Sequence, residues 1–408
     1  MSLRQPATTR VCIRAALAAA LLAVSFTVTV APAVAETSSD GNGEAAEASG
    51  DGKQAEDDGG DSAGGDGSGG DASGDGAGEQ ADTATTESEG RDAPAFRFPV
   101  ACRYGKTCFI QNYVDMRSGA GWRDHRCNHL SYDGHRGTDV RTPSWVEMRK
   151  GVKVIAAAPG EVKATRDGMR DISINRIDPE SIEGREAGNG VVLAHGDGWE
   201  TQYSHLKRGT VRVEEGERVE AGDVLGEIGL SGRTEFPHVQ FSVRHEGKTL
   251  DPFTGRRMED GCEGEVTPLW RPETAAKLDY IGAVVLDAGF AVGKPNPNRA
   301  RRGHYDADRL GARIPGLTFW VNVMGPRKGD VQRFLLLDPE GRPVVKRKRV
   351  IPENQARRFV FVGHKRPDQG WPSGCYRAQY SLARDGKRIT GIRRRVALGR
   401  GSCRCRGG

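Results

Sequence analysis

The chain has 408 residues, enough for two or three domains, and carries 60 basic and 55 acidic side chains. The charges are unevenly placed, because residues 36–90 hold sixteen acids and one lysine, which leaves the rest of the chain strongly basic. A basic body suits binding to an anionic surface such as a cell envelope. The alternative is that the arginine-rich composition only keeps the protein surface solvated. Nucleic acid is not an expected partner, since no stacking aromatic residues alternate with the basic ones.

Residues 1–35 are typical of a secretory signal peptide. Arg4, Arg10 and Arg14 precede an apolar run, and residues 33–35 are the small residues at which a signal peptidase cleaves. The apolar run is short for a membrane span, which needs roughly 20 residues, and no later segment offers a better one. We therefore expect export to the periplasm or the extracellular cell envelope, without stable membrane insertion after cleavage.

Residues 36–93 are expected to form a disordered linker. Glycine, serine, alanine and acidic residues dominate this segment, so it has too little apolar surface to repay the entropy of ordering. Its negative charge also allows it to fold back on the basic body as an electrostatic screen.

Seven of the eight cysteines follow the signal peptide. In an exported protein they are expected to form disulfides rather than metal sites. Cys102 with Cys108 would close a short loop, and Cys127 with Cys262 would tie together the two ends of one domain. The odd number leaves one cysteine free or bridging to a partner, among Cys375, Cys403 and Cys405.

Two all-β bodies are expected, at residues 94–265 and 270–400. Both consist of short apolar and alternating runs divided by glycine turns about every ten residues. Residues 268–278 read as one short helix or a linker. In the second body, Gly374-Cys375-Tyr376 resembles the tyrosine-corner region of immunoglobulin-like sandwiches, so we expect an Ig-like accessory domain. It lacks a cluster of catalytic residue types, and a basic, cysteine-containing tail follows at residues 401–408.

Histidines occur at three informative places in the first body. In GHRGTDVR, His135 and Asp139 are four residues apart; an extended strand would separate their Cα atoms by about 13 Å, so only a turn at the intervening glycine lets both reach one ion. In YSHL, His205 follows a strand-like run. In FPHVQFSVR, His238 and Gln240 are two apart in an alternating run and therefore leave the same face of a strand.

These three motifs, in this order, resemble those of the lysostaphin and LytM type of zinc peptidases, which cut peptide cross-links in bacterial cell walls. The resemblance implies a LytM-type β-sheet core with His135 and Asp139 as zinc ligands. It also implies that His205 and His238 act on the metal-bound water and stabilise the developing oxyanion. The third ligand of the family pattern is histidine, and here that position is Gln240.

The glutamine leaves the formal charge of the implied site unchanged, because an amide and a neutral imidazole carry the same charge. An amide oxygen is, however, a harder and weaker partner for zinc than an imidazole nitrogen. Changes in outer-shell partners alone lower metal affinity roughly 10 to 100-fold, so we expect at least that loss here.

Three functions remain open. We expect an exported, zinc-dependent endopeptidase that binds one zinc per chain and hydrolyses the peptide cross-links of peptidoglycan. The alternative is a catalytically degenerate domain that binds peptidoglycan peptides or activates a cell-wall hydrolase partner. In the third interpretation, both bodies form an envelope scaffold and the histidines only pack.

Overall fold

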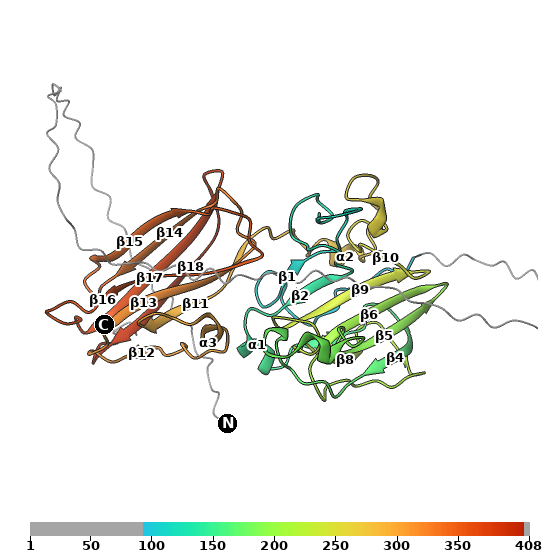
Figure 1. Ribbon diagram of the computed structural model, residues 1–408, viewed down its shortest axis with the longest axis horizontal. Coiled ribbons are helices and arrows are strands. Elements are labelled where there is room, and N and C mark those ends of the chain that lie inside the picture. Colours follow the sequence, from blue (N-terminus) through green and yellow to red (C-terminus); the bar gives the residue numbers. More distant parts are fainter. Residues whose placement is uncertain (1–92, 404–408) are drawn as a thin grey trace, which may run out of the picture. The chain divides into compact units, whose positions relative to one another are not determined.

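The computed structural model describes residues 93–403, which form two bodies built mainly from β-strands (Figure 1). This confirms the all-β expectation. The expected signal peptide, the acidic linker up to residue 92 and the last five residues of the tail lie outside the described residues. The domain limits, including 94–265 and 270–400, stay predictions.

The first body is organised around an eight-stranded antiparallel sheet in the order β1-β2-β9-β6-β5-β4-β7, with β10 paired to β9. A separate two-stranded sheet pairs β3 with β8. The strands are β1 (Phe109–Asn112), β2 (Thr138–Arg141), β3 (Lys153–Ile155), β4 (Gly160–Arg166), β5 (Asn189–Gly196), β6 (Trp199–Leu206), β7 (Arg218–Val219), β8 (Val224–Glu227), β9 (His238–His245) and β10 (Lys248–Leu250).

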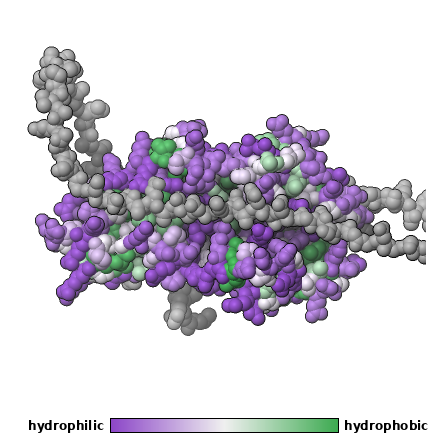
Figure 2. Space-filling model, in the orientation of Figure 1, coloured by the Kyte–Doolittle hydropathy of each residue, from purple (hydrophilic) through white to green (hydrophobic). Residues whose placement is uncertain are grey.

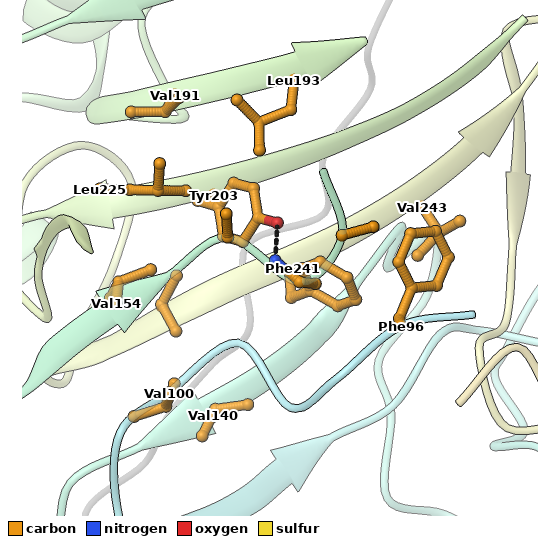
Figure 3. Packing of buried hydrophobic residues seen from close by; sticks show 14 of the residues in the cluster. Phe96, Val100, Val140, Val154, Val191, Leu193, Tyr203, Leu225, Phe241 and Val243 are labelled. Atoms are coloured by element: carbon orange, nitrogen blue, oxygen red, sulfur yellow. Dashed lines mark hydrogen bonds between the residues drawn. The ribbon is translucent and has the colours of Figure 1, made fainter. Parts of the chain in front are cut away.

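One face of this sheet packs into the core of the first body. In β5 the sequence NGVVLAHG buries alternate residues, as the two-residue period of a strand requires. Figure 3 shows Val191 and Leu193 of this strand packed near Tyr203, with Phe241 of β9 on the other side. The Tyr203 hydroxyl accepts a 2.8 Å hydrogen bond from the Ala157 amide, which satisfies both polar groups inside the core.

The second body contains a three-stranded sheet, β11-β13-β16, and a five-stranded sheet, β12-β18-β17-β14-β15. Apolar residues from both sheets form one buried cluster, which includes Phe319 and Tyr380. The strands are β11 (Val284–Val292), β12 (Arg309–Leu310), β13 (Gly316–Met324), β14 (Val331–Leu337), β15 (Pro343–Val350), β16 (Arg357–Lys365), β17 (Gly374–Arg384) and β18 (Lys387–Leu398).

Tyr376 has the contacts that its sequence position suggested. Its hydroxyl donates a 3.1 Å hydrogen bond to the Pro372 carbonyl four residues upstream, and Trp371 packs edge-on against its ring. A tyrosine tied to the backbone just before its own strand is the local arrangement of a tyrosine corner. The assignment of the second body as Ig-like stays a prediction.

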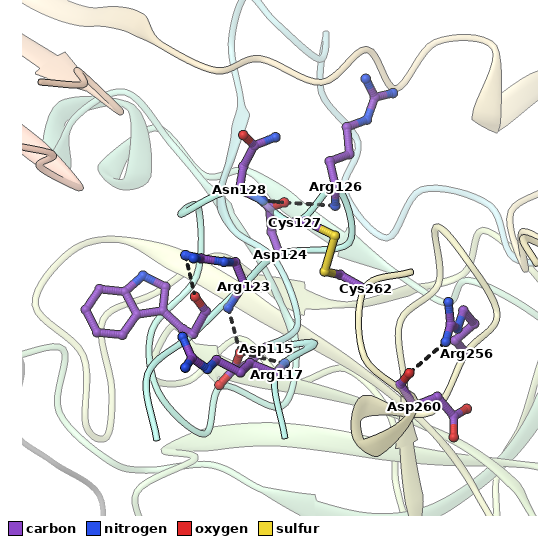
Figure 4. The surroundings of a disulfide bond; sticks show 11 residues. Asp115, Arg117, Arg123, Asp124, Arg126, Cys127, Asn128, Arg256, Asp260 and Cys262 are labelled. Carbon is purple, nitrogen blue, oxygen red and sulfur yellow. Dashed lines mark hydrogen bonds between the residues drawn. A yellow bond between two sulfur atoms is a disulfide. The ribbon is translucent and has the colours of Figure 1, made fainter. Parts of the chain in front are cut away.

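Three disulfides are present in the described residues: Cys102–Cys108, Cys127–Cys262 and Cys375–Cys403. The first two are the pairings considered from the sequence, and the third leaves Cys405 as the odd cysteine, outside the described residues. Figure 4 shows the Cys127–Cys262 bridge beside a loop in which Asp124 accepts hydrogen bonds from the Arg126 and Asn128 amides.

Helices are short throughout the described part of the chain, and none of them is long and apolar enough to cross a membrane. The visible described surface is mostly hydrophilic (Figure 2). The short helix expected within residues 268–278 is α2. The helices are α1 (Trp145–Arg149), α2 (Pro272–Ala275), α3 (Pro297–Arg301) and the 3-10 helices η1 (Ile174–Arg176), η2 (Pro179–Ile182) and η3 (Met258–Asp260).

Candidate functional site

The strands β2, β9 and β6 lie side by side and carry most of the residues singled out from the sequence (Figure 1). In the pairing of β2 with β9, Asp139 is opposite Gln240 and Arg141 is opposite His238. His205 is near the end of β6. Directly opposite residues in an antiparallel pair share one face of the sheet, so the polar side chains of β2 and β9 gather on the same side.

His135 lies in the turn before β2, and its ring folds back onto that strand. Its Nε2 atom is 3.1 Å from Asp139 Oδ1, so the two side chains converge as the turn at Gly137 was expected to allow. A Cβ atom on Gly137 would come within 2.7 Å of the Gln240 Cγ atom and 3.1 Å of the Phe241 carbonyl oxygen. Glycine therefore lets this turn approach β9 closely.

Asp139 is the centre of the cluster and is only 2% exposed. Its Oδ1 atom is also 3.4 Å from His238 Nε2, and its Oδ2 atom accepts a 2.8 Å hydrogen bond from the side-chain amide of Asn112 on β1. A buried carboxylate requires such partners, because desolvation of the charge is otherwise very costly.

All three histidines of the cluster are held by the backbone in the same way. Their Nδ1 atoms lie 2.8–2.9 Å from main-chain carbonyl oxygens, which cannot donate a proton, so each Nδ1 carries the hydrogen. In a neutral ring, Nε2 then has a free lone pair. The pairs are His135 with Tyr113, His205 with Ser231, and His238 with Phe236.

Two of these Nε2 atoms, those of His135 and His238, face the same oxygen of Asp139. Lone pairs directed at a carboxylate repel it, and a proton or a bound cation between them removes the repulsion. Burial alone would lower the pKa of His135, but the charge and hydrogen bond of Asp139 outweigh burial and raise it. The pKa of Asp139 is correspondingly held well below its usual value despite burial, by His135 and then His238.

His205 is the third histidine of the cluster, and its ring centroid is 4.7 Å from that of His238. Burial, followed by the charge of His238, lowers the pKa of His205 to about 3, so this ring is neutral at physiological pH. His205 also has a left-handed backbone, with φ of 63°, an arrangement that is strained in a residue other than glycine and clusters at functional sites.

Gln240 is adjacent to this cluster without joining its hydrogen bonds. It is half-buried, and its amide nitrogen donates a long 3.4 Å hydrogen bond to Ser242 two residues along β9. Among the hydrogen bonds of the described residues, none links Gln240 to His135 or Asp139. The structure therefore joins four of the five expected site residues in one cluster, and it places the fifth directly opposite Asp139 without a hydrogen bond to that cluster.

The donors present suit a cation such as zinc, which binds imidazole nitrogen and carboxylate oxygen. In the described residues, no three His, Cys, Asp or Glu side chains are arranged to hold a metal ion. His135 and Asp139 would therefore need a donor of another type, and Gln240 is the cross-strand neighbour of Asp139. Other histidines of the sheet are engaged elsewhere: His195 contacts Thr201, and His245 stacks on Trp199.

Two residues near the cluster were not identified from the sequence. Asn112 orients Asp139, and Arg141 is buried opposite His238 with its guanidinium 4.6 Å from the centre of the Phe236 ring. The sequence shows FIQN as strand-like, but only the pairing of β1 with β2 places Asn112 beside Asp139. The backbone carbonyls that hold the histidines have no signal in the sequence.

Comparison with known proteins finds sequence similarity in the first body. Residues 133–252 match the model of Peptidase family M23. The chain is 29% identical over 144 residues to DD-carboxypeptidase/endopeptidase Mpg of Neisseria meningitidis serogroup B, covering 35% of this chain and 27% of that protein. It is 28% identical over 152 residues to peptidoglycan DD-endopeptidase ShyC of Vibrio cholerae serotype O1, covering 36% and 30%.

The chain thus spans between a quarter and a third of the length of these relatives. Among solved structures, the catalytic domain of lysostaphin from Staphylococcus simulans is 20% identical, with 35% of this chain and 85% of that chain covered and a TM-score of 0.23. The resemblance expected from the three histidine motifs is confirmed, since the Peptidase family M23 match covers residues 133–252 of the first body, which include all three motifs.

Proposed function

We propose that this M23-type domain is a zinc-dependent endopeptidase that hydrolyses peptide cross-links of bacterial peptidoglycan. The proposal includes export, so that the protein acts in the periplasm or the extracellular cell envelope on peptidoglycan peptides. It is supported by the family match and by relatives named as peptidoglycan endopeptidases. The observation that carries it is the shared orientation of three histidines, each with Nδ1 on a backbone carbonyl.

In this proposal the zinc ion is held by His135, Asp139 and Gln240. The ion, when bound, would lower the pKa of a water molecule and polarise the scissile carbonyl group. Because the Tyr113 carbonyl holds Nδ1 of His135, Nε2 of that ring is the nitrogen available as a donor. Asn112 holds one oxygen of Asp139 and leaves the other for the ion.

The remaining two histidines handle protons and charge. His205 is neutral and has a free Nε2 lone pair, so it can accept a proton from the attacking water. His238 is oriented through Nδ1 by the Phe236 carbonyl, and in its doubly protonated form its Nε2 can donate to the oxyanion that forms as the peptide carbonyl is attacked.

Two observations favour the alternative function, a degenerate domain that binds wall peptides or activates a hydrolase partner. His135, Asp139, His205 and His238 are each at most 4% exposed, which leaves little room for a cross-linked peptide. In addition, the Gln240 amide is directed to Ser242 rather than to the other two proposed ligands.

The test is to measure zinc in the full mature protein by elemental analysis, after dialysis against zinc and then against zinc-free buffer, together with digestion of cross-linked muropeptides. We expect about one zinc per chain, lost in His135→Ala and kept in the control His364→Ala, an exposed histidine of the second body. Zinc retention with peptide cleavage supports the proposal. An absence of both in the native protein, with cleavage gained in Gln240→His, would show that the degenerate domain is correct.

The same zinc measurement on two further variants identifies the third zinc ligand. Gln240→Ala should release zinc if the amide is a ligand. If Gln240→Ala keeps zinc and His238→Ala loses it, the third donor is His238, whose Nε2 already lies 3.4 Å from Asp139.

A further inference from the structure

The outer face of the five-stranded sheet in the second body carries an array of positive side chains. The pairing of β15, β14, β17 and β18 places residues of like orientation in rows across the sheet. In one row, Leu337 is opposite Arg377, which is opposite Arg395. In the next, Lys346, Leu335, Gln379 and Arg393 follow one another. Six of the residues in these rows are positively charged and exposed, and we call them together the cationic face: Arg333, Lys346, Lys348, Arg377, Arg393 and Arg395.

No acidic residue occupies these rows. Asp338 and Glu340, in the turn between β14 and β15, are both paired with Arg342, at 2.7 Å and 3.0 Å, and Asp330, just before β14, is paired with Arg384 at 2.8 Å. Among the ion pairs found between described residues, none includes a member of the cationic face. Repulsion between neighbouring cations on a sheet is destabilising, so their uncompensated clustering needs an explanation other than stability.

The centre of the face is hollow. A surface cavity of about 430 Å³ has both leucines and arginines in its lining, which consists of Leu335, Leu337, Arg377, Ala378, Gln379, Arg393, Arg394 and Arg395. Guanidinium groups bind phosphate through two parallel hydrogen bonds, and four of the six cations are arginines.

We propose that the cationic face binds a linear phosphodiester polymer, in which negative phosphates alternate with short polyol units. The phosphates pair with arginines of neighbouring rows, and the polyol carbons lie over Leu335 and Leu337. This interaction is independent of the peptidase chemistry of the first body and would hold the protein on an anionic polymer.

Two other anionic partners fit the face less well. A lipid bilayer is bound through protruding apolar or aromatic side chains as well as charge, but the leucines of the cavity are only half-exposed and the rows hold no aromatic residue. Single-stranded nucleic acid is bound through aromatic stacking, which the same rows cannot provide.

The experiment measures binding of synthetic poly(glycerol phosphate) to the full mature protein by calorimetry at several salt concentrations. The test variant is Arg377→Gln/Arg393→Gln/Arg395→Gln. We expect at least tenfold weaker binding and a slope of log K against log salt that is smaller by about 2, because each phosphate contact contributes roughly 0.7 to the slope for a flexible polyanion. The single variant Arg393→Gln should show an intermediate loss, and it replaces the triple variant if that one does not fold.

The matched control is Lys328→Gln/Lys365→Gln/Lys387→Gln, which removes three exposed positive charges of the second body outside the rows. It should bind within twofold of the native protein. Equal weakening in test and control variants would overturn the proposal, because binding would then follow total charge alone. The proposal would also be overturned if the test variant bound phosphatidylglycerol vesicles more weakly than the native protein but bound the polymer equally well.

Discussion

In the first body, Asp139 is 2% exposed and lies against two histidines and an asparagine, whereas in the second body the six residues of the cationic face are exposed and lack ion pairs among the described residues. The buried charge of Asp139 is tolerated only because its partners are held at fixed positions, so its contribution depends on exact geometry. The exposed charges act through their summed field and tolerate movement. Substitutions in the two bodies should therefore have very different consequences.

The largest expected effect is on catalysis in the first body. Under the proposed function, His135→Ala removes a metal ligand and should lower the rate of muropeptide cleavage by more than about 1,000-fold, since removal of a single electrostatic catalytic element already costs roughly 100 to 1,000-fold. Turnover of cross-linked muropeptides is the measurement. Arg393→Gln on the cationic face should keep turnover within twofold of the native protein. An equal loss of turnover in the two variants would contradict the view that the cationic face takes no part in catalysis.

The disulfides allow the two bodies to be compared for stability. Cys127–Cys262 spans 135 residues and Cys375–Cys403 spans 28. The entropy of loop closure predicts that replacing both cysteines by serine costs about 5 kcal/mol for the first pair and about 3.5 kcal/mol for the second. Denaturant unfolding of the two double variants should show this order, and the reverse order would mean that strain, not loop length, decides.

Close packing can be tested with two glycines. Gly137→Ala should lower the free energy of unfolding by about 2 kcal/mol, because the new Cβ would overlap with Gln240 and force β2 and β9 apart. Gly311→Ala in the second body meets no atom within 4 Å and should change stability by less than about 0.5 kcal/mol. Chemical denaturation measures both; similar losses would show that the turn has room to relax.

The smallest effect concerns pH. Burial raises the pKa of Asp251 to about 7, although hydrogen bonds from Thr254 lower it. The folded state thus binds a proton that the unfolded state, with a pKa of about 3.9, has lost, so this residue's contribution to stability falls as pH rises from about 4 to 7. The slope is at most about 1.4 kcal/mol per pH unit, and unfolding of Asp251→Asn at pH 5 and pH 7 should show a smaller difference than the native protein.

Much of this architecture could be predicted from the sequence. Alternating runs indicated strands, and the turn at Gly137 explained how His135 and Asp139 meet. What could not be predicted depends on pairing between distant segments: Asn112 reaches Asp139 only through the contact of β1 with β2. Likewise, Arg377, Arg393 and Lys346 are far apart in the chain, and only strand register places them on one face.

The carbonyl groups that hold the three histidines belong to the main chain at residues 113, 231 and 236, and every amino acid has such a group. Mutation of those side chains cannot delete them, so the orientation of the rings can outlast the loss of activity over evolutionary time. Histidine and glutamine codons differ by a single nucleotide. Under the proposed function, one base change in codon 240 would therefore supply the histidine of the family pattern, with the carbonyl groups that orient the other rings already in position.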